Sequence, residues 1–231
     1  LESYGFPNSF LGGGILTLNS NGTLIDKHWC EFFQRHAFNV GVSIDGPEWA
    51  NRNRVNWSDA ESYQKILAGI GLLRVAEIEF SAICVVTDST VTKPEELYEF
   101  FCNLGCFSLG INFEEKIGVN RGAVNQSELV VDFWRRLFRA WRQNPLIEIQ
   151  AFRRTLSRLE DLSCGRPTVV QRTVDKIDLF PSISYSGDVV LLSPEFLDTK
   201  SVGHSDFIAG NVSSEPLLDI LSRWYNIQYV T

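Results

Sequence analysis

The chain has 231 residues, a formal net charge of −7 at pH 7, and 44% hydrophobic and 21% charged residues. These shares are typical of a folded protein and exclude an intrinsically disordered chain. The acidic balance argues against sequence-independent nucleic-acid binding, which needs a basic surface, and no apolar run is long enough to span a bilayer.

The chain begins with Leu1 and contains no methionine. Either an N-terminal part of a longer gene product is missing, or some residues are not represented, so we interpret the first residues as the middle of a longer protein. No basic-then-apolar start resembles a signal peptide, and we expect a cytoplasmic protein with neither membrane nor nucleic acid as partner.

The first half of the chain alternates strands and helices. Apolar, β-branched runs predict strands over 15–19, 40–44, 80–87 and 109–113. Apolar stripes predict a helix over 26–36, capped by Asp26, and capping-box spacing at 58–61 and 92–95 predicts two more, the second ending at Gly105. This order predicts an α/β fold with a parallel sheet and right-handed crossovers, either open or barrel-like.

After residue 122 the pattern changes. It predicts helices over 128–143 and 148–162, a β-hairpin over 181–192 and a short helix over 216–224. We therefore expect two domains, 1–122 and 123–231. The helix over 128–143 carries an arginine row, which we interpret as a solvated face, with an acidic partner as the alternative. The row consists of Arg135, Arg136, Arg139 and Arg142.

Polar side chains follow the predicted strands at the points where the strands end. Ligands of parallel α/β sheets sit beyond the carboxyl ends of the strands, so these residues predict a small-molecule site. Arg52 and Arg54 could pair with a ligand carboxylate. A plain turn at 45–47 is the alternative interpretation of this stretch. The strand-end set is Ser20, Asn21, Ser43, Asp45, Thr87, Glu114 and Glu115.

The cysteines and histidines do not predict a metal site. Cys102 and Cys106 are four residues apart on one helix, but two thiolates are too few, and core packing is the better interpretation. Cys30 and Cys84 fall on apolar faces, and Cys164, at a helix end, is the least clearly structural. The histidines have no ligand spacing.

Several short motifs follow one another along the chain. They are Ser-Asn-Gly-Thr-Leu at 20–24 with Trp-Cys at 29–30, Val-Ser-Ile-Asp-Gly-Pro at 42–47, Arg-Val at 54–55, Ser-Tyr-Ser-Gly-Asp-Val at 184–189, Leu-Ser-Pro-Glu at 192–195 and Gly-Asn-Val at 210–212. In their order and spacing these motifs resemble the radical S-adenosylmethionine (SAM) peptide maturases, the sulfatase-maturase-like enzymes with a SPASM or related C-terminal extension. The tail resembles the subgroup that forms cyclophane crosslinks in ribosomally made peptides (RiPPs).

This resemblance implies a partial (β/α)6 radical SAM barrel over 1–122, truncated at its N-terminal side, followed by a SPASM-like helical and β-hairpin extension over 123–231. It implies SAM and a [4Fe-4S] cluster as cofactors. It implies a precursor peptide as substrate and a reductant such as ferredoxin or flavodoxin.

The resemblance also implies roles for individual residues. Ser43 and Arg54 would bind the SAM carboxylate, and Asp45 would support the strand end. Further SAM contacts would come from Ser20 and Asn21, and from Gly12 and Gly13, which resemble the segment that binds the SAM amine.

Three departures from the family pattern concern the cofactors. The C-x-x-x-C-x-x-C cluster motif does not occur in the sequence, and Gly14 stands where the amine-binding segment has glutamate. Ser193 falls where cluster-bearing relatives have a cysteine, which leaves Cys164 as a lone candidate for an auxiliary cluster. We therefore assign no metal ligands in this chain.

The leading hypothesis is a radical SAM oxidoreductase that crosslinks or otherwise modifies a peptide by hydrogen abstraction. The chain, without the cluster-binding segment, would be inactive. The alternative is a cluster-less, non-catalytic relative that binds a peptide or a partner maturase. A third hypothesis is an unrelated α/β enzyme that uses Glu114 and Glu115 as acid and base.

Overall fold

The computed structural model describes residues 16–52, 54, 62–114, 127–165, 180–197, 199 and 206–223. The chain divides into two compact units, Leu1–Ser157 and Arg158–Thr231, which are described separately. The predicted site residues Gly12, Gly13 and Glu115 lie outside the described residues, as does the capping box at 58–61.

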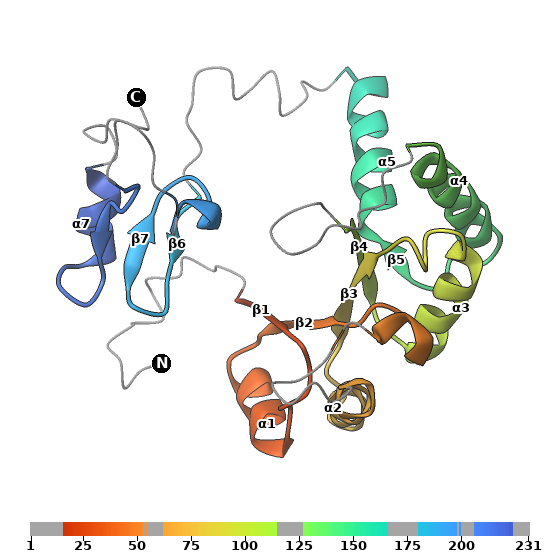
Figure 1. The fold of residues 1–231 in the computed structure, drawn as a ribbon, viewed down its shortest axis with the longest axis horizontal. Helices are drawn as coiled ribbons and strands as arrows, with labels where there is room; N and C mark the ends of the chain where they lie inside the picture. Colours follow the sequence, from red (N-terminus) through yellow and green to blue (C-terminus); the bar gives the residue numbers. More distant parts are fainter. Residues whose placement is uncertain are drawn as a thin grey trace. The chain divides into compact units, whose positions relative to one another are not determined.

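The first unit is built on a five-stranded sheet in the order β1-β2-β3-β4-β5 (Figure 1). All neighbouring strands pair in parallel, and strands that are consecutive in the chain lie side by side. The predicted α/β class and parallel sheet are confirmed. The strands are β1 (Thr17–Ser20), β2 (Asn39–Ser43), β3 (Phe80–Val86), β4 (Ser108–Phe113) and β5 (Glu148–Ile149).

Four helices pack against one face of this sheet and form the main core. β3 shows the arrangement, because its residues alternate between buried and half-buried along the strand. Ala82 and Cys84 of β3 share the core with Phe101 and Phe133 from two of the helices. The helices are α1 (Lys27–Arg35), α2 (Tyr63–Val75), α3 (Pro94–Leu104) and α4 (Ser127–Gln143), and the short η3 (Glu48–Asn51) follows β2.

The helix starts agree with the sequence in one case and differ in another. Asp26 caps α1 as predicted, and its Oδ1 accepts a hydrogen bond from the Trp29 amide over 2.9 Å. The capping box at 92–95 is wrong, because Lys93 is the N-cap of α3 and no side chain caps the helix. Pro94 begins α3 instead, where its missing N–H group leaves no hydrogen bond unmade. Gly105 ends α3 with φ 77°, as predicted.

The prediction of one helix from residue 148 is also wrong. Residues Glu148–Ile149 form β5, which pairs with Ser108 and Leu109 of β4, and α5 (Gln150–Ser163) begins directly afterwards. Ile149 is buried in the core, so tertiary pairing prevails over helical spacing. Because α4 and β5 pack with the sheet, the compact units divide later in the chain than the expected boundary at 122.

The arginine row of α4 is only partly a solvated face. Arg135, Arg139 and Arg142 are exposed. Arg136 instead donates two hydrogen bonds to the carboxylate of Glu95 on α3, over 2.9 and 2.6 Å. Arg136 therefore links two helices. None of the described helices is long and apolar enough to cross a membrane.

The second unit contains the predicted hairpin. β6 (Ser182–Ile183) pairs antiparallel with β7 (Asp188–Val190), and β7 pairs antiparallel with β8 (Gly210–Asn211). The unit also holds η4 (Pro194–Leu197) and α7 (Leu217–Ser222). Its small core consists of Val189, Leu191 and Ile220.

Candidate functional site

The loop after β2 is organised around the carboxylate of Asp45. This side chain is buried, and its Oδ1 accepts a hydrogen bond from the Val85 amide of β3 over 2.9 Å. Arg54 donates to both carboxylate oxygens, from Nε to Oδ2 over 2.6 Å and from Nη2 to Oδ1 over 2.7 Å. Asp45 thereby fixes Arg54 beside the carboxyl ends of β2 and β3.

Asn51 shapes the same loop, and sequence reasoning missed it. Its Oδ1 accepts from the Asp45 amide over 2.9 Å, and its Nδ2 donates to the carbonyls of Gly46 and Pro47 over 2.7 and 2.8 Å. Gly46 has φ 133°, and a Cβ there would lie 2.5 Å from Leu97 Cδ2, so the turn requires glycine. Nothing in the local sequence distinguishes Asn51 from an ordinary loop asparagine.

The other predicted strand-end residues near β2 have different surroundings. Ser43 is half-buried at the end of β2, and its hydroxyl has no hydrogen bond among the described residues. Ser20 pairs in register with Val42, and its Oγ accepts from the Gly22 amide over 3.1 Å. Asn21 Oδ1 accepts from the amide and hydroxyl of Thr23. Ser20 and Asn21 therefore stabilise the turn after β1, while Ser43 remains available.

Thr87 and Glu114 lie apart from this group, in a hollow at the ends of β3 and β4 that we call the strand-end hollow. Its volume is about 590 Å³. Arg52 also lines it, so Arg52 and Arg54 do not converge on one point. The remaining lining residues are Trp49, Ala50, Asp88, Ser89 and Lys93, with the Lys93 ammonium 4.1 Å from the Trp49 ring centre. The use of Glu114 with Glu115 as acid and base stays a prediction.

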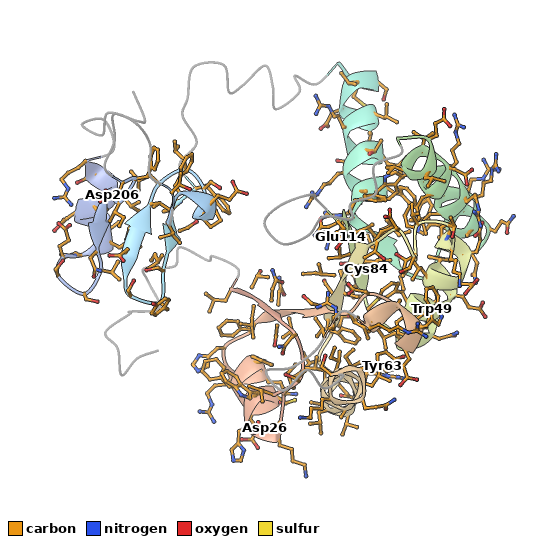
Figure 2. All side chains as sticks on the ribbon, viewed as in Figure 1. Asp26, Trp49, Tyr63, Cys84, Glu114 and Asp206 are labelled. Atoms are coloured by element: carbon orange, nitrogen blue, oxygen red, sulfur yellow. The ribbon has the colours of Figure 1, made fainter. Side chains whose placement is uncertain are left out.

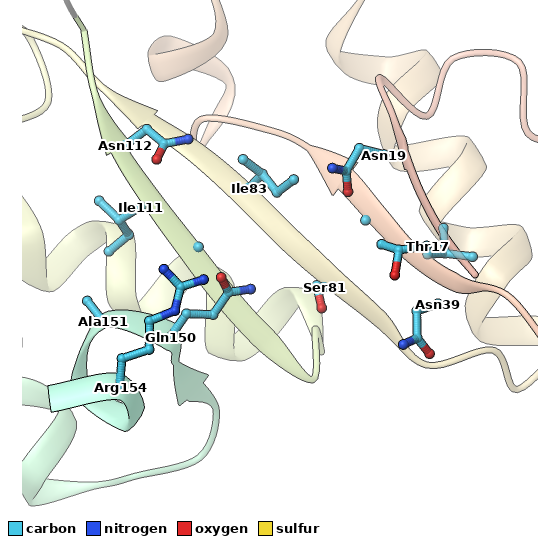
Figure 3. Close-up of a pocket in the computed structure, with 13 residues that line it drawn as sticks. Thr17, Asn19, Asn39, Ser81, Ile83, Ile111, Asn112, Gln150, Ala151 and Arg154 are labelled. Carbon is cyan, nitrogen blue, oxygen red and sulfur yellow. The ribbon is translucent and has the colours of Figure 1, made fainter. Parts of the chain in front are cut away.

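A second hollow, the inner-face cavity, lies over the sheet face opposite helices α1 to α4 (Figure 3). Its volume is about 370 Å³. Gly41 allows the Asn19 side chain to lie close to the backbone of β2, because a Cβ at position 41 would overlap Oδ1 of Asn19. Sequence reasoning missed this cavity, although the alternating polar residues of the strands were a signal for it. Its polar lining residues are Thr17, Asn19, Asn39, Ser81, Asn112, Gln150 and Arg154.

Four of the described thiols are poor candidates for cluster ligands, which must be thiolates, while the fifth, Cys164, is exposed. Burial raises the pKa of Cys106 to about 12. Burial, and then the nearby Asp45 carboxylate, raise the pKa of Cys84 above its ordinary value. Burial also raises the pKa of Cys30 and Cys102. Figure 2 draws the described side chains and labels Cys84. Among the described residues, no three histidine, cysteine or acidic side chains gather where they could hold a metal ion.

The tail motifs meet in the second unit. Asp188 pairs in register with Asn211, and Asn211 Nδ2 donates to Asp188 Oδ1 over 2.8 Å. Ser186 Oγ donates to the other oxygen, Oδ2, over 2.8 Å. The two sequence segments at 184–189 and 210–212 therefore form one hydrogen-bonded hairpin end.

Comparison with known proteins gives relatives over most of the chain, although no protein-family model matches it. An uncharacterized protein of Synechocystis sp. is 27% identical over 216 residues, which cover 88% of this chain and 52% of that protein. The serine-type anaerobic sulfatase-maturating enzyme of Bacteroides thetaiotaomicron is 40% identical over 90 residues, which cover 38% of this chain and 22% of the enzyme. The chain thus spans about half the length of the Synechocystis protein and matches a smaller share of the Bacteroides enzyme.

Solved structures of native anSMEcpe share the fold. The structure with bound AdoMet has a TM-score of 0.68 at 20% identity, over 90% of this chain and 56% of that chain. The structure with AdoMet and the Cp18Cys peptide has a TM-score of 0.66 at 20% identity, over 96% and 63%. The predicted resemblance to sulfatase-maturase-like radical SAM proteins is confirmed, as is the α/β fold of that group. The narrower likeness to cyclophane-forming enzymes stays a prediction.

Proposed function

We propose that this chain, a homologue of the anaerobic sulfatase-maturating enzymes, supplies the SAM-binding strand ends of a radical SAM peptide maturase. The observation that supports this most directly is the position of Arg54. Asp45 fixes it at the carboxyl edge of a parallel sheet, where α/β proteins bind their ligands. Ser43 ends the strand that leads to Asp45.

The side chains at this edge fit the carboxylate of SAM. Arg54 uses Nε and Nη2 for Asp45, and the N–H groups of Nη1, which bond to none of the described residues, can donate to a ligand. The Ser43 hydroxyl, which has no partner in the described part of the chain, can donate a second hydrogen bond. Asp45 then acts by positioning Arg54, and Ser20 and Asn21 act by holding the neighbouring turn. Gly12 and Gly13 are proposed to bind the SAM amine.

No three cysteines among the described residues gather where they could hold a [4Fe-4S] cluster, so we propose that its ligands come from a part of the protein outside the described residues. SAM and the reduced cluster together supply the radical that starts hydrogen abstraction in this family. The proposed substrate is a ribosomally made peptide that becomes crosslinked or otherwise modified. That anSMEcpe was solved with a peptide supports this substrate class. The reductant would be a ferredoxin or flavodoxin.

Calorimetric titration of the full-length protein with SAM tests the proposal. Replacing both Ser43 and Arg54 by alanine should abolish SAM binding, while Arg139→Ala on the exposed face of α4 should leave it unchanged. Because Arg54→Ala also leaves Asp45 unpaired, Ser43→Ala alone is the cleaner variant. It removes one hydrogen bond to a charged group and should weaken binding by about tenfold. Unchanged affinity in the double variant would refute the assignment.

The second candidate function is a cluster-less relative that binds a peptide or a partner maturase. The burial of Cys30, Cys84 and Cys106 favours it, since only Cys164 is exposed among the described thiols. Two observations separate the candidates. A three-cysteine motif in the reading frame before Leu1 would support the maturase, and a start codon close to Leu1 would support the binding module. Anaerobic reconstitution of this chain with iron and sulfide should give no brown chromophore under either candidate.

A further inference from the structure

Among the described residues that line the inner-face cavity, Arg154 alone carries a charge, and none of them has a carboxylate. Gln150 and Arg154 are four residues apart on α5, so they lie on the same side of the helix. Figure 3 shows both side chains extending from α5 toward the strands.

Arg154 and the preceding residue, Arg153, differ in whether they form an ion pair. Arg153 forms an ion pair with Glu148, with Nε 2.9 Å from Oε1. Arg154 has no ion pair or hydrogen bond to any described residue. Its charge is therefore available to an anionic group that enters the cavity, and a guanidinium can hold a carboxylate with two parallel hydrogen bonds.

The rest of the lining suits a peptide backbone. Asn19, Asn39 and Asn112 present side-chain amides to the cavity, and none of them bonds to a described residue. Each amide has one acceptor and two donors, which match the N–H and C=O groups of a peptide bond. Gln150 is partly committed, since its Nε2 lies 3.4 Å from Ser108 Oγ, which in turn lies 2.9 Å from Ser81 Oγ.

From this arrangement we infer that the inner-face cavity binds a peptide segment with an acidic side chain, and that Arg154 selects the carboxylate. The inference rests on the proposed function for the substrate class, a peptide. It adds that the protein prefers a peptide with a negatively charged residue. Arg154 would contact the substrate and determine its specificity. It lies on α5, away from the strand ends that would hold SAM.

Two tripeptides that differ only in charge test this inference. They are N-acetyl-Gly-Glu-Gly-amide and its Gln analogue, titrated into the full-length protein and followed by NMR. We expect the Glu peptide to bind about tenfold more tightly, because hydrogen bonds to charged groups discriminate to this degree. Arg154→Gln should remove the preference, and Arg154→Lys should retain part of it. The matched control, Arg139→Gln on α4, should leave it unchanged.

Other outcomes overturn the inference. It fails if the native protein binds both peptides equally or neither, or if the preference survives in Arg154→Gln. Acetate distinguishes a peptide site from a general anion site, and acetate binding as tight as that of the Glu peptide would also overturn it. SAM titration of the same samples keeps the two proposals separate. Intact SAM binding without a Glu preference refutes only this inference, and the reverse result refutes only the proposed function.

Discussion

Asp45 and Arg54 are joined by two hydrogen bonds across an ion pair, from Nε to Oδ2 over 2.6 Å and from Nη2 to Oδ1 over 2.7 Å. The Asp45 side chain is 10% exposed and that of Arg54 is 22% exposed. These two residues, nine positions apart in the sequence, thus form one structural unit. The Arg54 guanidinium that would bind a ligand is therefore already oriented in the absence of that ligand.

Replacing Asp45 with asparagine should destabilise the first unit. The change leaves the Arg54 charge largely removed from water without its counter-charge, which costs about 2–4 kcal/mol in the free energy of unfolding. Urea unfolding followed by far-UV circular dichroism measures this. Glu95→Gln is the matched control. It breaks the more exposed pair with Arg136, so its effect should stay below about 1 kcal/mol. Equal effects would contradict the structural role of Asp45.

Asn51→Ala should cost about 2–3 kcal/mol in the same measurement, because it leaves the Asp45 amide and the carbonyls of Gly46 and Pro47 without their partner. Asn51→Asp keeps the acceptor for the Asp45 amide but loses the donor. Because Asn51 is buried, the new carboxylate would face the carbonyl oxygens of Gly46 and Pro47, so its stability at neutral pH should be no higher than that of the alanine variant. If the alanine variant is as stable as the native protein, the turn does not depend on this side chain.

The thiols should react with Ellman's reagent in the order of their exposure. Cys164 is exposed and should react first in mildly alkaline solution. Cys84 and Cys106 have raised pKa values, so less of each thiol is thiolate at a given pH, and burial blocks access as well. Both should react only after urea unfolding. In Cys164→Ser the fast phase should disappear, and a remaining fast phase would contradict this order.

In the second unit, hydrogen bonds from Ser186 and then Asn211 hold the pKa of Asp188 below its ordinary value. Folding thus favours the carboxylate. Its contribution is complete above the ordinary pKa of aspartate and is lost as the pH falls through the lowered value. Asn211→Ala should raise the pKa of Asp188 toward the ordinary value, as followed by the NMR titration of its carboxyl carbon. An unchanged titration would show that Asn211 has no such effect.

The sequence predicted most of what depends on local pattern. The strands and helices of the first unit, the Asp26 cap and the hairpin are encoded by apolar spacing and turn residues close in the chain. β5 was missed because two residues become a strand only through pairing with β4. The role of Asn51 was missed for a related reason. Its partners, the Asp45 amide and two carbonyls, are fixed by how the loop folds back on itself.

The SAM site stays a prediction, but the structure shows where its described residues lie. The described strand-end residues lie at the carboxyl edge, but they divide among the turn after β1, the Asp45 loop and the strand-end hollow. The sequence alone cannot show this division, because the twist of a sheet separates side chains that follow neighbouring strands. Nor could it show Arg154 at the inner-face cavity, since α5 reaches that cavity only through β5.

The contact between Gly41 and Asn19 has a consequence for how this protein can diverge. Any side chain at position 41 would displace the Asn19 amide from the inner face. Substitutions at the two positions should therefore be correlated among homologues, with a residue larger than glycine at 41 tolerated only beside a smaller one at 19. The pair would mark lineages whose cavity has changed in shape.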